Sequence, residues 1–396
     1  MDVNRIFELD ELAREDAARY PRKREAYARI SSHEGKRFTG IVGPRGVGKT
    51  VLLKQMAVET PRSVYVSMDT VEKGNLFDLV KELHERNEIT TLLLDEIHFQ
   101  RDYARTLKML FDFLDLRIVF TSSVSLSLFE SSYDLSRRAR LETLYPFSFR
   151  EHLLFRKNRA LPKLELDRIV RKEWDREHLR HEYLFESYLK GDLFPFSLEE
   201  PDVLSALKNL LAKIIQKDIP MVADVTLQEV QRMDKLVEFV GKSASEGISY
   251  SSISRNLGIT KYKAEQYVGL LEKAFVLNPV FPAGTNVLRE PKVLMYLPFR
   301  LLYSDYEDAA GYLREDFFAE TMKMREMPFH YLKSTRGAKT PDFLVPRKGG
   351  DIVVEIGGRG KGRSQFKGVE VSEKVILVHP GSVDGLRRPL FLLGFV

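Results

Sequence analysis

The stretch RFTGIVGPRGVGKTVLLKQMA, from Arg37 to Ala57, decides the fold. It begins with a short apolar run that favours a strand, passes through a glycine-rich turn and continues as a helix. The turn, Gly43 to Thr50, has the spacing G-x-x-x-x-G-K-[ST] of a phosphate-binding loop. Glycines let backbone N–H groups converge on phosphate oxygens at the amino end of a helix, where the helix dipole also favours anions. The sequence therefore predicts an α/β domain of the P-loop nucleotide-binding class.

Two side chains of this loop have expected roles. Lys49 would reach the β- and γ-phosphates, and Thr50 would ligate Mg²⁺. ATP and Mg²⁺ are therefore the expected cofactors. The residues predicted to bind the nucleotide are Gly43, Pro44, Arg45, Gly46, Val47, Gly48, Lys49, Thr50 and Val51.

A second strand should end in acids. The stretch TTLLLDEIHFQ, Thr90 to Gln100, is a run of apolar or β-tolerant residues followed by Asp95 and Glu96. In a chain with a phosphate-binding loop, Asp95 would hold Mg²⁺ through water, and Glu96 would orient or deprotonate the attacking water. These residues predict ATP hydrolysis in addition to ATP binding.

The segments around these motifs alternate between the residue pattern of a strand and that of a helix. We expect strands at SVYVSMD (63–69) and RIVFTSS (117–123), and helices at 75–87 and 102–114. Such alternation predicts a parallel sheet with its ligand at the carboxyl ends of the strands. Ser122 or Ser123 would lie there as a polar sensor of the γ-phosphate or the water, or else as a helix N-cap.

An arginine cluster follows at Arg137, Arg138 and Arg140. An arginine at this position could act as a finger on the γ-phosphate bound by a neighbouring subunit, which would require a homo-oligomer. A cluster of arginines is also typical of a solvated or salt-bridged face. The sequence leaves both interpretations open.

Composition restricts the class of protein. The chain has 396 residues, 43% of them hydrophobic and 30% charged, which predicts two or three soluble domains. The formal net charge is +5 and the pI is about 9.0, which is compatible with nucleic acid binding but does not establish it. The absence of cysteine excludes disulfides, thiolate metal sites and cysteine nucleophiles.

The ends and the apolar runs bear on localisation. The acidic N-terminus does not have the pattern of a signal peptide, and no apolar run approaches the length of a membrane span. We therefore expect a cytoplasmic protein without a membrane partner. The abundance of Lys, Arg and Glu, with few Asn and Gln, resembles a thermophile's composition.

The order of the motifs GPRGVGKT, LLLDEIH, VFTSS, SRRAR and PFSFREHL resembles a group of prokaryotic AAA+-type ATPases. That group carries a C-terminal domain of unknown function with a restriction-endonuclease-like fold. The resemblance covers essentially the whole chain and assigns the finger role to Arg138, although the preceding residue is Arg137 where the group commonly has glycine. It implies a P-loop core with an N-terminal helical segment at 1–155, a helical lid at 156–225 and a nuclease-like domain at 301–396.

Residues 226–300 have the pattern of a winged helix. A helix, a short helix SSISRNLG, a tight turn at Gly258 and a long helix from Thr260 are followed by β-prone residues. Lys261 and Lys263 on the long helix could contact DNA. Winged helices also bind proteins or act as rigid spacers, so the partner could be DNA or a protein.

The stretch TPDFLVPRKGGDIVVEIGG, Thr340 to Gly358, looks like the metal-binding hairpin of a restriction-type nuclease. The resemblance implies a possible second metal site formed by Glu315 on the preceding helix, Asp342 and Glu355. The lysine expected two residues after the glutamate is replaced by Gly357.

Two interpretations of this replacement stay open. Lys361 could take the place of the missing lysine in an active nuclease. Alternatively, a basic loop formed by Arg359, Lys361, Arg363, Gln365 and Lys367 could bind phosphate without cutting, or the domain could be a scaffold. We therefore expect an Mg-dependent ATPase coupled to a DNA-binding, non-cleaving nuclease-like domain. The alternatives are a nucleotide-switched scaffold that acts on a protein partner and an ATP-dependent nuclease.

Overall fold

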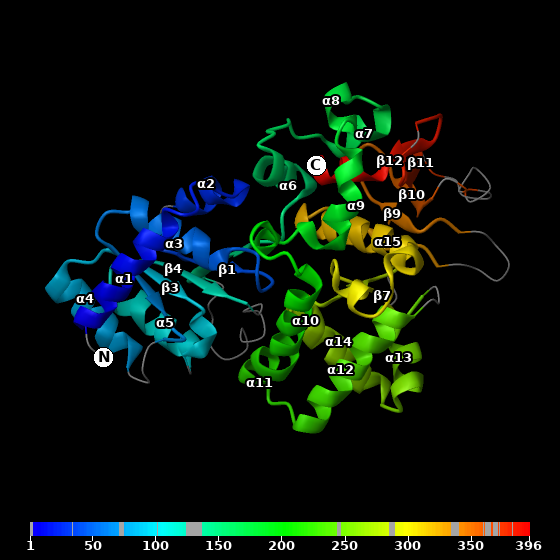
Figure 1. Ribbon diagram of the computed structural model, residues 1–396. Helices are drawn as coiled ribbons and strands as arrows, with labels where there is room; N and C mark the ends of the chain where they lie inside the picture. Colours follow the sequence, from blue (N-terminus) through cyan, green and yellow to red (C-terminus); the bar gives the residue numbers. More distant parts are fainter. Residues whose placement is uncertain are drawn as a thin grey trace. The chain divides into compact units, whose positions relative to one another are not determined.

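The chain divides into two compact units, each of which is described by itself. Unit 1 comprises Met1–Pro146 and Lys213–Thr226, and unit 2 comprises Phe147–Ala212 and Leu227–Val396. Figure 1 labels their helices and strands. The computed structural model describes residues 3–33, 35–70, 75–100, 102–123, 137–243, 247–284, 290–333, 340–358, 360, 366, 371, 373–381 and 383–396.

Unit 1 is built on a five-stranded parallel sheet with the order β2-β3-β4-β1-β5. The central strands are apolar on both faces, as expected of a parallel sheet covered by helices on both sides. This confirms the predicted α/β fold with a parallel sheet. The strands are β1 (Phe38–Val42), β2 (Ser63–Ser67), β3 (Thr91–Asp95), β4 (Arg117–Ser122) and β5 (Ala139–Thr143).

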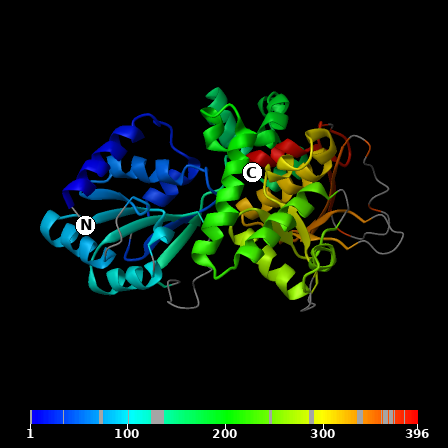
Figure 2. The ribbon, with the colours of Figure 1, turned by 60° about the horizontal axis from the view of Figure 1, so that its bottom comes forward.

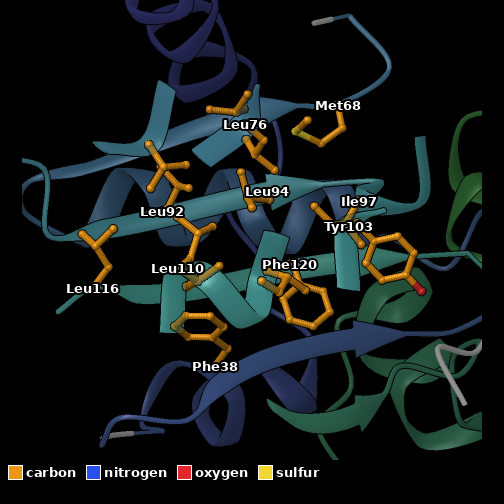
Figure 3. Close-up of a cluster of buried hydrophobic side chains, with 14 of the residues drawn as sticks. Phe38, Met68, Leu76, Leu92, Leu94, Ile97, Tyr103, Leu110, Leu116 and Phe120 are labelled. Carbon is orange, nitrogen blue, oxygen red and sulfur yellow. The ribbon is translucent and has the colours of Figure 1, made fainter. Parts of the chain in front are cut away.

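Helices cover both faces of this sheet, and Figure 2 shows the blue helices on one side and the cyan helices on the other. Figure 3 shows the core between the sheet and one layer, where Leu92, Leu94 and Phe120 pack with Leu110. Alternate residues of each strand point to this face, so hydrophobic burial fixes the register of the sheet. The helices are α1 (Val3–Ala17), α2 (Glu25–Ser31), α3 (Lys49–Glu59), α4 (Leu76–Asn87), the 3₁₀ helix η1 (Ile97–Phe99) and α5 (Tyr103–Phe113).

The last segment of unit 1 comes from far along the chain. Residues Ile214–Asp218 form a π-helical turn, η6, that leads into the short helix α11 (Ile219–Val222). Ile214, Ile215 and Ile219 are fully buried, and so is the carboxylate of Asp218. The predicted lid at 156–225 is therefore divided: this end of it packs in unit 1, and the rest packs in unit 2.

The N-terminal part of unit 2 packs against the end of the chain. Leu164 N donates to Phe395 O (2.8 Å), and the ring of Phe149 lies edge-on to the rings of Phe185 and Phe395. These contacts explain why 147–212 belongs with the C-terminal residues. Its elements are α6 (Phe149–Lys157), α7 (Leu166–Arg171), α8 (Arg176–Leu179), η3 (Glu182–Leu184), α9 (Phe185–Ser187), η4 (Tyr188–Asp192), η5 (Pro195–Leu198) and α10 (Val203–Lys213).

Three helices and a hairpin follow in unit 2. Ser249 and Thr260 cap the second and third helices, and Gly258 adopts the left-handed conformation in the turn between them. Because one helix ends at Gly258 and the next is capped by Thr260, the turn between them is short. The elements are α12 (Leu227–Lys242), α13 (Tyr250–Leu257), α14 (Lys261–Lys273) and the antiparallel strands β6 (Leu277–Val280) and β7 (Lys292–Met295).

The C-terminal part of unit 2 is a mixed sheet with a long helix. The strand order is β12-β11-β10-β9-β8; β9 is antiparallel to β8 and β10, while β10, β11 and β12 are parallel. The elements are η7 (Phe299–Leu302), α15 (Tyr306–Met324), β8 (His330–Tyr331), β9 (Phe343–Val345), β10 (Ile352–Gly357), β11 (Glu373–Val378), β12 (Arg387–Pro389) and η9 (Leu390–Phe395).

Two buried acids of α15 bind the neighbouring segments of unit 2. Asp316 accepts from Arg300 Nε (2.8 Å) and from Met295 N (3.0 Å), and Arg300 also donates to Val240 O (2.9 Å). Glu320 accepts from Leu297 N (2.9 Å), and burial raises its pKa to about 8. Glu320 therefore connects α15 to the segment that follows β7.

Among the described residues, no helix is long and apolar enough to span a bilayer.

Candidate nucleotide site

The register of the sheet brings the predicted residues to one edge. Val42 pairs with Ser122, and Ser67 pairs with Asp95, so these strands end side by side. The loop that follows β1 therefore lies at the same edge as the acids that follow β3. This edge is where open parallel sheets bind their ligands.

Two glycines shape the loop. A side chain on Gly43 would place its Cβ 2.1 Å from Leu144 O, so only glycine fits there. Gly48 has φ 88° and stands at the N-cap of α3, where it forms no side-chain cap. The left-handed turn at Gly48 directs the first N–H groups of α3 toward the loop, which forms an anion site.

Lys49 begins α3 and lies almost fully buried under the loop. Its Nζ donates to Gly43 O and Pro44 O, both at 2.8 Å. Burial lowers its pKa, while Glu96 and Asp95 oppose that shift. The structure thus places an ammonium group directly beneath the glycine-rich turn.

Thr50 and Asp95 lie side by side. Thr50 Oγ1 donates to Asp95 Oδ2 (2.7 Å), and Tyr65 OH donates to the same oxygen (2.9 Å). Thr121 Oγ1 donates to Asp95 Oδ1. Burial raises the pKa of Asp95, and the hydrogen bonds from Thr121 and Thr50 counteract this shift. A hydroxyl and a carboxylate so close together form the oxygen donor set that Mg²⁺ prefers.

Glu96 is held between a cation and an imidazole. Its backbone is left-handed (φ 52°), an uncommon conformation for this residue type, and its N–H donates to Thr121 Oγ1 (2.8 Å). Its Oε1 lies 3.5 Å from Arg45 Nη1, and its Oε2 lies 3.2 Å from His98 Nδ1. The side chain is thereby fixed beside Asp95.

The predicted sensor Ser122 contacts this histidine. Ser122 Oγ lies 3.3 Å from His98 Nδ1, and both side chains are buried. Burial lowers the pKa of His98 to about 4, so the imidazole is neutral at pH 7. Its contact with Glu96 is thus a close approach of a neutral ring to a carboxylate and not an ion pair. The residues after Ser123 lie outside the described part of the chain, so the N-cap alternative stays open.

A cavity of about 510 Å³ opens at this edge. Its polar wall includes Thr50, Asp95 and Glu96, and its apolar wall comes from α1. The phosphate-binding loop, the two acids and a cavity therefore lie at the same edge of the sheet. The residues present fit a nucleotide with Mg²⁺. The lining residues are Ile6, Leu9, Leu12, Ala13, Arg45, Thr50, Lys54, Tyr65, Val66, Ser67, Asp69, Thr70, Asp95, Glu96, Phe99 and Lys213.

Arg138 lies at the other end of the sheet. Its carbonyl accepts from Phe38 N, at the start of β1, and its Nε lies 3.2 Å from Asp112 Oδ1. The length of β1 separates it from the loop, which is about 15 Å for a five-residue strand. This place does not suit a finger on the chain's own nucleotide. A finger role in a neighbouring subunit stays a prediction.

The second proposed metal site contains a lysine. Burial raises the pKa of Asp342, and the nearby carboxylates of Glu315 and Glu355 raise it further. The three predicted acids are therefore neighbours, but Lys292 Nζ donates to Glu315 Oε2 and lowers the pKa of Asp342.

Further observations bear on the possible second metal site. Asp342 Oδ2 also accepts from Ile356 N (2.7 Å). Among the described residues, no group of three or more His, Asp or Glu side chains is arranged to hold a metal ion. An ammonium group of the chain thus partly compensates these acids, and their role as metal ligands stays a prediction.

Of the residues predicted to contact DNA, two lysines are described by the structure and the basic loop is not. Lys261 pairs with Glu290 (2.5 Å), and Lys263 pairs with Glu229 (2.6 Å). Both lysines are thus compensated by acids of the same unit. Lys361 and the rest of its basic loop at Arg359, Arg363, Gln365 and Lys367 lie outside the described residues.

Several residues of the two sites were not predicted. Thr121 precedes the serine chosen as the sensor, and it contacts both Asp95 and Glu96 because its side chain points to their side of β4. A polar residue inside an apolar strand could have signalled this. Tyr65 contacts Asp95, Lys292 contacts Glu315 and Asp218 contacts Arg45, each from another segment of the chain, and no motif marks them.

Comparison with known proteins gives a family match for two parts of the chain. Residues 35–153 match a family described as an AAA domain, so the chain contains an AAA-type P-loop ATPase domain. This confirms the coarse assignment of the first domain. Residues 191–296 match a domain of unknown function. The winged-helix and nuclease-like assignments stay predictions.

Relatives with known sequence or structure are distant. The chain is 26% identical over 403 residues to the uncharacterized protein MJ1637 of Methanocaldococcus jannaschii, covering 91% of this chain and 85% of the relative. The Aeropyrum pernix ORC1 protein in complex with DNA is 13% identical, with 79% and 94% of the chains covered and a TM-score of 0.29. The Thermotoga maritima RuvB Holliday junction branch migration motor is 14% identical, with 73% and 91% covered and a TM-score of 0.25. At such low TM-scores, nothing further follows from these structures.

Proposed function

We propose that this protein binds ATP with Mg²⁺ and hydrolyses it at the carboxyl edge of the unit 1 sheet. The observation that carries the proposal is the convergence of Lys49, Thr50, Asp95 and Glu96 at that edge, beside a cavity. Residues from two motifs that lie far apart in the sequence meet in the arrangement that phosphoryl transfer to water requires. The AAA family match supports the same reaction class.

Each group has a task in this proposal. The N–H groups at the start of α3 and Lys49 bind phosphate oxygens, and Thr50 with Asp95 would hold Mg²⁺. When bound, Mg²⁺ supplies charge that neutralises the phosphate oxygens. Glu96 accepts a hydrogen bond from the attacking water and orients it. Ser122 holds the neutral His98 against Glu96, which keeps the carboxylate in place.

The proposal predicts that Glu96→Gln binds ATP but turns it over at least about 100-fold more slowly than the wild type. Glutamine keeps the shape of the side chain but cannot accept the proton or carry the negative charge. The measurements are phosphate release and equilibrium binding of ATP, with the exposed Glu82→Gln on α4 as the control. Equal turnover by Glu96→Gln and the wild type would contradict the proposed role.

For unit 2, we propose a winged helix at 226–300 and a nuclease-like domain that does not cleave DNA. The first is supported by the order of α12, α13, α14 and the β6–β7 hairpin. The second is supported by the helix α15 before a mixed sheet, with acids on β10 and just before β9. In this proposal, the ammonium group of Lys292 takes the place of a metal ion beside these acids. Gly357 stands where a nuclease would need its catalytic lysine.

We expect Lys292→Met to lower the free energy of unfolding of unit 2 by about 2 to 4 kcal/mol. The substitution leaves Glu315, Asp342 and Glu355 close together without their ammonium group. Millimolar MgCl₂ should restore part of this loss in the variant and leave the wild type unchanged. The emission of Trp174, the chain's only tryptophan, reports the unfolding of unit 2.

Lys323→Met is the control for this prediction, because it removes a more exposed ion pair with Glu272 in the same unit. It should cost less than about 1 kcal/mol and respond to no cation. Equal stabilisation of the wild type and Lys292→Met by MgCl₂ would show instead that the acids bind a metal in the native protein.

The target of the ATPase is proposed to be DNA, with a protein partner as the second candidate. The charge of +5 supports DNA, whereas the ion pairs of Lys261 and Lys263 favour a protein partner for α14. Turnover measured with and without duplex DNA separates the two. Stimulation by DNA supports the first, and slow turnover that DNA does not change supports the second.

A further inference from the structure

A buried carboxylate lies behind the phosphate-binding loop. Asp218, on the π-helical turn η6, is 0% exposed. Arg45 Nη2 donates to its Oδ1 (2.7 Å), and Arg45 Nε donates to its Oδ2, so the pair is bidentate. Because an unpaired buried charge is costly, each partner fixes the position of the other.

Arg45 connects this carboxylate to the proposed catalytic glutamate. From the same guanidinium, Nη1 lies 3.5 Å from Glu96 Oε1. The guanidinium is planar and has a fixed fork of donors, so a bidentate partner on one side sets where the remaining nitrogen points. The orientation of Glu96 thus depends on Asp218 through Arg45.

Other contacts hold the turn that carries Asp218 against neighbouring segments of unit 1. Ser123 Oγ donates to Asp218 Oδ2 (3.4 Å) just beyond β4, and Lys217 Nζ lies 5.1 Å from the centre of the Phe99 ring. The flanking Ile215 and Ile219 are fully buried. The turn therefore contacts the loop, the sensor strand and the residues after the acid strand.

We propose that Asp218 is a positioning residue for ATP hydrolysis, which acts through Arg45 to hold Glu96 in line with the attacking water. This inference rests on the proposed function. It adds a requirement that the motifs do not contain, because Asp218 lies 173 residues after Arg45 and touches none of the expected nucleotide ligands except Arg45. Substitution of a carboxylate with only a structural role would change the stability of the protein and would have no specific effect on kcat.

Asp218→Asn keeps the size of the side chain and removes the charge. We expect kcat to fall about 10- to 100-fold, since Glu96 loses its fixed orientation, while KM for ATP stays within about threefold. Asp218→Glu should recover part of the rate. Gln216→Ala, an exposed change in the same turn, is the control and should keep the wild-type kcat and KM.

A double-mutant cycle with Arg45→Ala tests the route. If Asp218 acts through Arg45, Asp218→Asn should lower kcat no further in the Arg45→Ala background. An equal further loss there, or a wild-type kcat for Asp218→Asn, would overturn the inference. Comparing the wild type with Lys49→Ala tests the proposed function separately. If those two rates are equal, both the function and the positioning role are wrong; if the wild type is active and Asp218→Asn matches it, only the positioning role is wrong.

Discussion

Lys49→Ala should lower ATP turnover by about 100- to 1,000-fold and weaken ATP binding. The ammonium lies beneath the loop with two carbonyl contacts, whereas the guanidinium of Arg45, the other cation of the loop, is bound to Asp218. Alanine leaves the phosphates with backbone donors only. Phosphate release and the binding of a fluorescent ATP analogue measure the two losses.

The control for this prediction is Lys81→Ala, which removes an exposed lysine from α4 in the same unit. It should leave turnover and binding unchanged. Thermal unfolding of Lys49→Ala should stay near that of the wild type, because the substitution also removes the cost of a buried charge. Turnover at the wild-type rate in Lys49→Ala would refute the proposed ATPase site.

Asp316→Ala should destabilise unit 2 by about 3 to 5 kcal/mol. Arg300 is 2% exposed, and its loss of Asp316 leaves a guanidinium buried without its carboxylate. Met295 N loses an acceptor in the same substitution. Urea unfolding followed by the emission of Trp174 measures the change in unit 2.

Two further variants separate the ion pair from packing. Asp308→Ala removes an exposed acid from the first turn of α15 and should cost less than about 1 kcal/mol. Arg300→Met combined with Asp316→Ala should be more stable than Asp316→Ala alone, because no unpaired charge remains. If the double variant is less stable than Asp316→Ala, the loss comes from packing and not from the unpaired guanidinium.

The parts of the site that lie close together in the sequence could be predicted. The loop at Gly43–Thr50 and the acids after β3 each occupy a few adjacent residues, and their chemistry follows from residue type and spacing. The helix expected at 75–87 is observed at Leu76–Asn87, because its apolar positions repeat with the helical period. The family match confirms the domain to which these elements belong.

Contacts between distant segments could not be predicted. Asp218 meets Arg45 because a helix that begins in unit 2 ends in unit 1, and no local pattern marks Lys213 as that boundary. Lys292 reaches Glu315 from a hairpin strand, whereas the sequence offers Lys361 only as one candidate to replace the missing lysine. Thr121 rather than Ser122 contacts the acids, which depends on the face of β4 that each residue occupies.

The interrupted chain path of unit 1 has a consequence for synthesis on the ribosome. The AAA match ends at residue 153, but the carboxylate that compensates Arg45 is translated only at residue 218. Until then the nascent unit 1 contains a guanidinium without its partner, while residues 147–212 emerge before most of unit 2 exists. The ATPase unit can therefore complete its native contacts only after more than half of the chain has been made. A recombinant fragment for studying it must include residues 213–226 as well as the first 146.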